Sequence, residues 1–131
     1  MGSAKRVALV TGSASGIGSA VAVRLANEGL DTIVNYSQSA DSASDTAEKC
    51  TAAGSDTLLV QCDVSNEAGV ESMLDDIEKK YGRLDAVVNN AGTSISTLAK
   101  DFDKVSEEEF DRVLAVNVKG MFLVAKHSKA L

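Results

Sequence analysis

Thr11-Gly12-Ser13-Ala14-Ser15-Gly16-Ile17-Gly18 follows directly on the apolar run Val7-Ala8-Leu9-Val10. A short apolar run that ends at a glycine is typical of a strand buried on both faces. Gly12 permits a sharp turn, Gly16 lets the backbone lie against a phosphate, and Gly18 lets the next helix pack closely on the strand. The free N–H groups and the positive dipole end of that helix favour an anion. The stretch therefore predicts a strand–turn–helix unit that binds a pyrophosphate.

The spacing of these glycines separates one kind of phosphate-binding turn from others. Glycines at positions 12, 16 and 18 give G-x-x-x-G-x-G, whereas many dinucleotide enzymes carry G-x-G-x-x-G. A Walker phosphate loop is excluded, because no Lys-Ser or Lys-Thr pair follows the last glycine. A plain strand–helix turn is the alternative, and the further strand and helix patterns downstream argue against it.

Strand and helix patterns alternate along the rest of the chain. We expect strands at 6–10, 32–34, 57–62 and 86–88, and helices at 16–28, from about 44 to 53, from 65 or 66 to 81, and from 106 to 131. Ser65 or Asn66 can cap the third helix, and Ser106 with Glu109 forms a capping box. Regular alternation predicts one α/β domain over residues 1–131, a doubly wound parallel sheet of Rossmann type with helices on both faces.

The apolar positions of the last two helices indicate which sides face the core. In the third helix they are Val70, Met73, Leu74, Ile77 and Tyr81. In the last helix the side expected to face inward carries Phe110, Val113, Leu114, Asn117, Met121 and Val124.

Composition limits the class of partner and compartment. A formal charge of −6 over 131 residues argues against binding a nucleic acid, whose partners usually show basic faces. Cys50 and Cys62 have no metal-ligand spacing, so we expect small, buried thiols and no metal site. No apolar run approaches the roughly 20 residues that span a bilayer. We expect a cytoplasmic protein.

Three motifs, in order, resemble those of the short-chain dehydrogenase/reductase family. Residues 11–18 match its T-G-x-x-x-G-x-G signature, Asn89-Asn90-Ala91-Gly92 matches N-N-A-G, and Asn117 stands where the family keeps a catalytic asparagine. The resemblance covers essentially the whole chain but only about the first half of a family member, with 3-oxoacyl-thioester reductases as similar examples. It implies strand order 3-2-1-4, in a sheet incomplete relative to the family.

The resemblance also implies a dinucleotide site at the carboxyl ends of the strands, where ligands bind in open α/β sheets. Its expected residues are Gly12, Ser13, Ser15, Gly16, Ile17 and Gly18 in the turn, Asn35, Tyr36 and Ser37 after the second strand, Asp63 and Val64 after the third, and Asn90, Ala91 and Gly92 after the fourth. Asp63 and the backbone of Val64 would contact adenine, the alternative for Asp63 being a loop cap. Thr11 is expected to be structural, tying the first strand to its neighbour.

The residues after the second strand bear on the choice of cofactor. A carboxylate there would bind a ribose 2′-hydroxyl and repel a 2′-phosphate. This chain has Asn35-Tyr36-Ser37-Gln38 and no acid until Asp41, which favours NADP(H) over NAD(H). The preference is mild, because Ser15 stands where many NADP-preferring relatives carry arginine.

The family reaction is hydride transfer between a nicotinamide and a carbonyl or alcohol on a small substrate. The resemblance implies that Asn117 kinks its helix and holds a water in a proton relay, whereas an amide inside a helix more often satisfies a local backbone group. The family's serine and Tyr-x-x-x-Lys are absent, since Ala40 and Asp85 follow Tyr36 and Tyr81 at the lysine position. We therefore expect an amino-terminal portion that is inactive by itself.

Two other classes of function remain to be weighed. A non-enzymatic nucleotide-binding or assembly module, completed by a second copy or a complementing chain, would use the edge of the fourth strand and the apolar last helix. A phosphorylation-receiver domain is disfavoured, because Thr11-Gly12 stands where an acidic pair would bind Mg²⁺. The resemblance implies a homo-oligomer, and His127 is expected to be a solvated helix residue.

Overall fold

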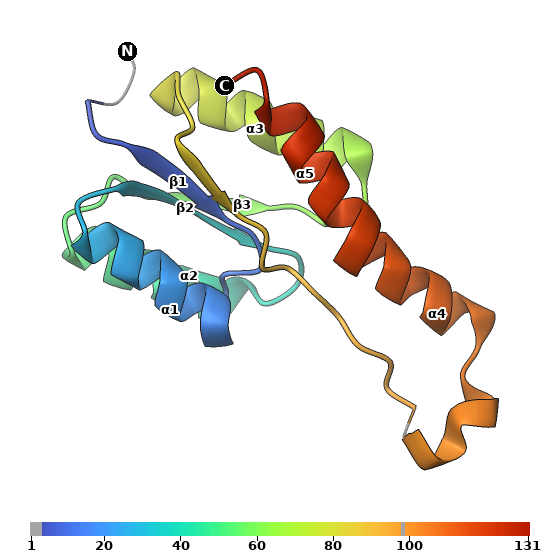
Figure 1. Ribbon diagram of the computed structural model, residues 1–131. Helices are drawn as coiled ribbons and strands as arrows, with labels where there is room; N and C mark the ends of the chain where they lie inside the picture. Colours follow the sequence, from blue (N-terminus) through green and yellow to red (C-terminus); the bar gives the residue numbers. More distant parts are fainter. Residues whose placement is uncertain (1–3, 98) are drawn as a thin grey trace.

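Four parallel strands form the sheet at the centre of the computed structural model, which describes residues 4–97 and 99–131 (Figure 1). The strands are β1 (Val7–Val10), β2 (Asp31–Tyr36), β3 (Leu58–Gln61) and β4 (Ala86–Val88). Their order is β3-β2-β1-β4, as the family resemblance implied. In the register, Leu9 of β1 lies between Ile33 of β2 and Val87 of β4. β2 is longer than expected, because both its ends pair with neighbouring strands.

Helices cover both faces of the sheet (Figure 1). On one face lie α1 (Gly16–Asn27) and α2 (Ala40–Ala52), and on the other α3 (Glu67–Tyr81) and α5 (Gly120–Ser128). α4 (Glu107–Leu114) continues the line of α5 beyond the ends of the strands. A 3₁₀ segment, η1 (Ala99–Lys104), precedes α4, and a π-helical segment, η2 (Ala115–Lys119), joins α4 to α5. Right-handed crossovers between parallel strands produce such a doubly wound arrangement.

The core consists of two apolar layers, one on each face of the sheet. Every residue of β1 is fully buried, as expected of a central strand. Leu9 and Ile33 pack toward α3 and α5, in the same cluster as Ile77 and Val124. The second layer, toward α1 and α2, comprises Val10, Ala22, Ala26, Val34, Ala43 and Cys50. The stripe predicted for α3 is buried throughout.

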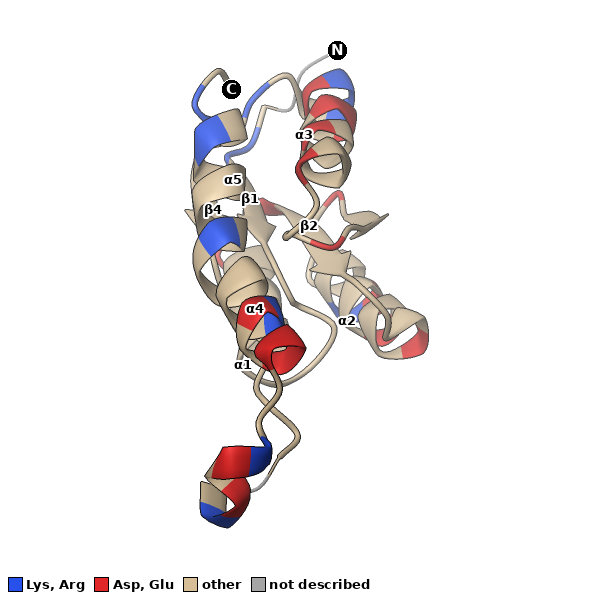
Figure 2. Ribbon diagram, turned by 90° about the vertical axis from the view of Figure 1, so that its right-hand side faces the viewer, with Lys and Arg blue, Asp and Glu red and all other residues tan. Residues whose placement is uncertain are grey.

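Local signals begin and end α3 and α4 close to where the sequence indicated, whereas α2 begins at Ala40, earlier than the start expected near residue 44. Asn66, rather than Ser65, caps α3, and its side chain accepts a hydrogen bond from the backbone N–H of Gly69 at 3.0 Å. Gly82 ends this helix in the left-handed conformation, at φ +66°. The capping box of Ser106 and Glu109 is present at the start of α4, where Figure 2 shows acidic residues in the first turn.

The last helical run differs from the expectation in which side it buries. It continues from α4 through η2 into α5, and its buried residues are Val116, Gly120, Leu123 and Val124. Phe110, Leu114 and Met121 were expected inside, but they are 58%, 45% and 45% exposed. Apolar residues form two stripes along this helix. Because a π turn contains more residues than an α turn, the residues after η2 face a different direction from the one that a continuous α-helix would give them.

The segment between β4 and α4 extends away from the sheet, and η1 lies at its far end (Figure 1). It fits the longer, mixed connection expected there. Across the described residues, no helix combines the length and apolar character needed to cross a membrane.

Gly120 is predicted to be required by packing. A Cβ at this position would lie 2.6 Å from Cγ2 of Val64, a buried side chain, so Gly120→Ala forces the helix away from its neighbour. We expect a loss of about 1–3 kcal/mol in the free energy of unfolding, measured by urea denaturation.

Gly69→Ala is the matched control, because a Cβ there has its nearest contact at 3.6 Å, from Sγ of Cys62. Alanine should stabilise α3 by roughly 0.5–1 kcal/mol. A Gly120→Ala protein that is as stable as Gly69→Ala would contradict the packing seen at Val64.

Candidate functional site

A polar groove of about 340 Å³ opens at the carboxyl ends of the strands. Gly12, Ser37, Cys62 and Asn90 follow β1, β2, β3 and β4 respectively, and each lines the groove. Of the predicted site residues, Gly12, Asn35, Ser37, Asp63, Val64, Asn90, Ala91 and Gly92 line it. Ser13, Ser15, Gly16, Ile17, Gly18, Tyr36 and Asn117 are not among its lining residues.

The glycine turn after β1 is packed against the chain leaving β4. Gly12 has a φ of +62°, and a Cβ there would lie 2.7 Å from Cα of Ala91. A Cβ on Gly18 would collide with the side-chain amide of Asn90 and the carbonyl of Gly12. Only glycine fits at either position, so the close approach predicted for Gly18 is present, with Asn90 and the turn itself as the neighbours.

Thr11 and Asn90 fasten β1 to β4 at the floor of the groove. The Thr11 hydroxyl oxygen accepts hydrogen bonds from the backbone N–H groups of Asn90 and Ala91, both at 3.0 Å. The Asn90 side chain donates to the carbonyls of Thr11 and Gly12 at 3.1 and 3.0 Å. The structural role expected of Thr11 is confirmed, and the Asn90 amide also serves the turn.

Asn35 and Ser13 fasten the other side of the turn to β2, and both are buried. The Asn35 side chain accepts from the backbone N–H of Gly12 at 3.1 Å and donates to the carbonyls of Val60 and Cys62. The Ser13 hydroxyl donates to Val10 and accepts from the Asn35 backbone. These side chains therefore position the turn, and the geometry gives no support for Asn35 as a donor to a ribose phosphate.

The start of α1 presents backbone to solvent. Ser15 is the N-cap residue, and its side chain makes no capping hydrogen bond. Ser15, Gly16 and Ile17 are exposed. Gly16 has a φ of +58°, and a Cβ there would meet nothing within 4 Å, so this glycine serves backbone conformation beside open space. An uncapped, exposed helix start suits an anionic ligand.

Asp63 pairs with a cation that the sequence reading missed. Its carboxylate accepts from the backbone and hydroxyl of Ser65 at 3.0 and 2.7 Å, and from Nη1 of Arg112 at 3.0 Å. Burial opposes ionisation, but the hydrogen bonds from Ser65 and Arg112 together hold the pKa of Asp63 below its ordinary value. Arg112 also lines the groove, as does Val116 one turn later.

Asn117 lies in η2 and fastens it to the segment after β4. Its side chain accepts from the backbone N–H of Thr93 and donates to the Thr93 carbonyl, both at 2.8 Å. The amide thus satisfies backbone groups of another segment, while the helix around it is π-helical, a form frequent at functional sites.

Four other residues considered in the sequence analysis, which are Tyr81, the two cysteines and His127, lie outside the groove lining or are buried. The Tyr81 hydroxyl donates to the carbonyl of Asp56 at 2.9 Å, and burial, with the charge of Asp56, raises its pKa. Both cysteines are free and buried as expected, and burial with the neighbouring Asp63 raises the pKa of Cys62 to about 11. His127 is not the solvated residue we expected: its side chain is 20% exposed and lies 2.8 Å from Glu67.

Known proteins are similar to this chain in both sequence and fold. Residues 6–130 match the family described as short chain dehydrogenase. The chain is 43% identical over 123 residues to elsinochrome reductase 1 of Elsinoe fawcettii and 38% identical to a probable tetrahydroxynaphthalene reductase of Zymoseptoria tritici. Each alignment covers 94% of this chain and 45% of the relative, so the chain spans about half the length of these curated relatives.

The fold is likewise similar to half of a solved structure. A short-chain dehydrogenase/reductase structure from Burkholderia xenovorans superposes with a TM-score of 0.92 at 34% identity, over 96% of this chain and 52% of that one.

Thr11→Val tests the fastening between β1 and β4. The substitution removes the acceptor of two backbone N–H groups, so we expect a loss of about 1–3 kcal/mol in the free energy of unfolding by urea titration. Thr51→Val is the control, because the Thr51 hydroxyl bonds only to its own helix on an exposed face. Equal, small effects of both substitutions would count against a special role for Thr11.

Arg112→Gln tests the charge pair in the groove. Loss of the guanidinium should raise the pKa of Asp63 toward its ordinary value, as measured by carboxyl ¹³C NMR. Because the folded-state pKa is depressed, the interactions of Asp63 contribute stability above its unfolded pKa, and that stability is lost as the pH falls through the folded-state pKa. Arg83→Gln, which disrupts only the pair with Asp85, should leave Asp63 unchanged. An unaltered Asp63 pKa in Arg112→Gln would refute the pairing.

Proposed function

This chain belongs to the short-chain dehydrogenase family, and on that premise we propose that it is the dinucleotide-binding portion of an NADP(H)-dependent oxidoreductase that acts on a carbonyl or alcohol. The observation that carries the proposal is the polar groove at the carboxyl ends of the strands, with an uncapped helix start and a glycine turn that only glycine permits. The groove and the glycine turn lie where the strand order reverses, between β1 and β4, and ligands bind at such a crevice in open α/β sheets.

The residues present fit a dinucleotide. The backbone at Gly16 and Ile17 would hold the pyrophosphate, since the start of α1 is exposed and lacks a side-chain cap. Asp63 and Val64 would meet the adenine from the end of β3, where both line the groove. Ala91 and Gly92 are small enough to leave space beside β4 for the nicotinamide end. The cofactor would not need direct contact with Ser13, Asn35 or Asn90, because these residues hold the glycine turn in place.

The preference for NADP(H) rests on the residues after β2. With Asn35 engaged inside the sheet, Ser37 and Gln38 are the groove-lining residues at this strand end, and neither is acidic. A neutral polar end accepts a 2′-phosphate, whereas a carboxylate would repel it.

The proposed reaction is hydride transfer, for which the bound nicotinamide supplies or accepts the hydride. Asn117 acts as a positioning residue, because its amide holds η2 against Thr93 at the groove. Neither tyrosine fits the family's acid–base role: Tyr81 is buried on Asp56, and Tyr36 ends β2. The 131-residue chain alone is therefore proposed to be catalytically inactive. Two relatives are named as reductases, which favours reduction over oxidation. The likeness to 3-oxoacyl-thioester reductases, a cytoplasmic location, and a homo-oligomer or complementing chain remain predictions.

A second candidate function is a nucleotide-binding module completed by further polypeptide. One side of the last helical run carries exposed apolar residues: Phe110, Leu114, Val118, Met121 and Phe122. β4 forms an edge of the sheet, and its side chains are only half-buried. Size-exclusion chromatography with light scattering tests this candidate function. If it is correct, the chain should self-associate or form a complex with a chain that carries the rest of the fold. A soluble monomer with no affinity for a chain carrying the rest of the fold would argue against it.

Ser37→Asp tests the proposed cofactor site. A carboxylate in place of the hydroxyl should weaken NADPH binding at least ten-fold and leave NADH binding nearly unchanged, as measured by fluorescence titration. The control is Ser72→Asp, which adds the same charge on an exposed position of α3. Equal NADPH affinity in Ser37→Asp and wild type would contradict the placement of the 2′-phosphate.

The purified 131-residue chain is expected to bind NADPH but not to oxidise it in the presence of ketones. Turnover at rates ordinary for the family would refute the proposed inactivity of the isolated chain. Absence of any nucleotide binding by a folded chain would refute the cofactor site itself.

A further inference from the structure

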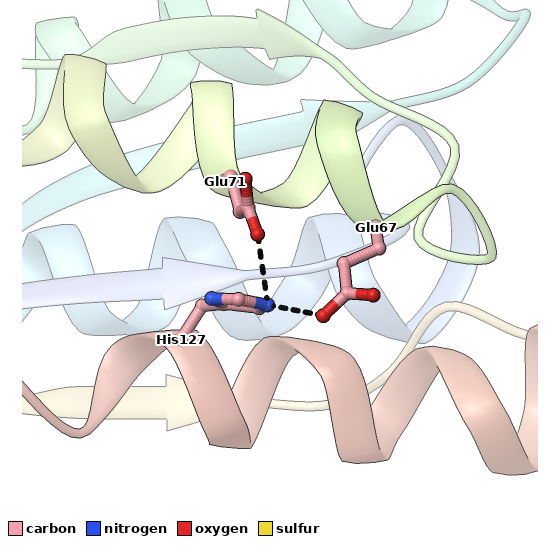
Figure 3. A group of neighbouring side chains, drawn as sticks. All are labelled: Glu67, Glu71 and His127. Carbon is pink, nitrogen blue, oxygen red and sulfur yellow. Dashed lines mark hydrogen bonds and ion pairs between the residues drawn. The ribbon is translucent and has the colours of Figure 1, made fainter.

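Two acidic side chains on α3 face an imidazole on α5 (Figure 3), and none of the three residues lines the groove. Glu67 and Glu71 lie one helical turn apart, so their carboxylates share a face. Nε2 of His127 lies 2.8 Å from Oε1 of Glu67 and 3.5 Å from Oε1 of Glu71. One ligand atom from each of the three residues lies within 4.8 Å of the others.

The two separations that join Nε2 of His127 to the carboxylate oxygens are comparable to those of atoms that share a small metal ion. In a tetrahedral zinc site, with bonds of about 2.0–2.2 Å, ligand atoms are roughly 3.4 Å apart. The His127–Glu71 distance already matches, and the His127–Glu67 distance needs only a modest opening. Three protein ligands from two helices would leave a fourth position for water, since both carboxylates are about half exposed.

The donor set selects the class of metal. An imidazole nitrogen with carboxylate oxygens suits zinc and its transition-metal neighbours, whereas Mg²⁺ and Ca²⁺ prefer oxygen ligands alone. Hydrogen bonds from Lys126 and then His127 hold the pKa of Glu67 below its ordinary value. Both cysteines are buried, and neither belongs to this cluster.

Lys126 is the competitor for this position. Its Nζ donates to Oε1 of Glu67 at 2.7 Å, the same oxygen that faces His127. The lysine side chain is 49% exposed and can swing into solvent, so an ion would replace one positive partner of Glu67 by another.

We propose that Glu67, Glu71 and His127 form a binding site for Zn²⁺ or a similar transition-metal ion, which clamps α5 to α3. No spacing in the sequence signals this site, because its ligands come from helices about 60 positions apart. Since the same helical run carries Asn117, an ion here would also stabilise the segment that η2 fastens to the groove. The site stands on the cluster itself and does not depend on the proposed cofactor.

Zinc titration of the purified protein, followed by NMR of its imidazole, tests the site directly. The sequence contains one histidine, so its ring signals need no assignment by mutation. We expect Zn²⁺, but not Mg²⁺ at the same concentration, to shift these signals and to raise the melting temperature. Imidazole signals that do not change when Zn²⁺ is added would overturn the proposal.

Variants separate this site from general attraction to an acidic surface. His127→Gln and Glu71→Gln should each weaken zinc binding at least ten-fold. Glu78→Gln, which makes the same charge change as Glu71→Gln at another exposed position of α3, should not weaken it. Lys126→Met should strengthen zinc binding, because it removes the competitor for Glu67. Circular dichroism checks that each variant folds. Equal zinc affinity in His127→Gln and Glu78→Gln would overturn the proposal.

Discussion

The arrangement of the site depends on hydrogen bonds that hold one glycine turn between two strands. Asn35 binds the turn from β2, while Thr11 and Asn90 bind it to the end of β4. Burying amides is favourable only if they are paired, and among the described residues no buried side-chain nitrogen or oxygen lacks a hydrogen bond. The turn is therefore rigid before any ligand arrives, and the exposed start of α1 is aimed by the same contacts.

Much of the fold could be predicted from the sequence, because its signals are local. Short apolar runs located the strands, the first of them followed by the glycine turn, and caps such as Asn66 and Ser106 set the helix starts. The side of the last helix that faces inward could not be predicted in the same way. Apolar residues occupy two of its stripes, and which stripe is buried depends on the π turn at η2 and on where the sheet ends.

In the candidate site, too, the features set by local sequence could be predicted, and those set by distant partners could not. Gly12 and Gly18 were found because their requirement is a backbone property, visible in spacing alone. The roles of Asn35 and Arg112 were not, because each is decided by a partner far along the chain. Asn35 bonds to the carbonyls of β3 and its exit, and Arg112 reaches Asp63 across 49 positions. Residue type restricts what such side chains can bond to, but only the folded sheet selects the partner.

The order of the strands also constrains how this chain folds in time. β1 is made first and lies in the interior of the sheet, yet its contact with the chain entering β4 joins Val7 to Asp85, 78 positions away. Pairings this distant close large loops and form slowly. During synthesis β1 can pair with β2 early, while its other edge stays open until β4 has emerged from the ribosome. A chaperone or a neighbouring nascent chain would meet that open edge first.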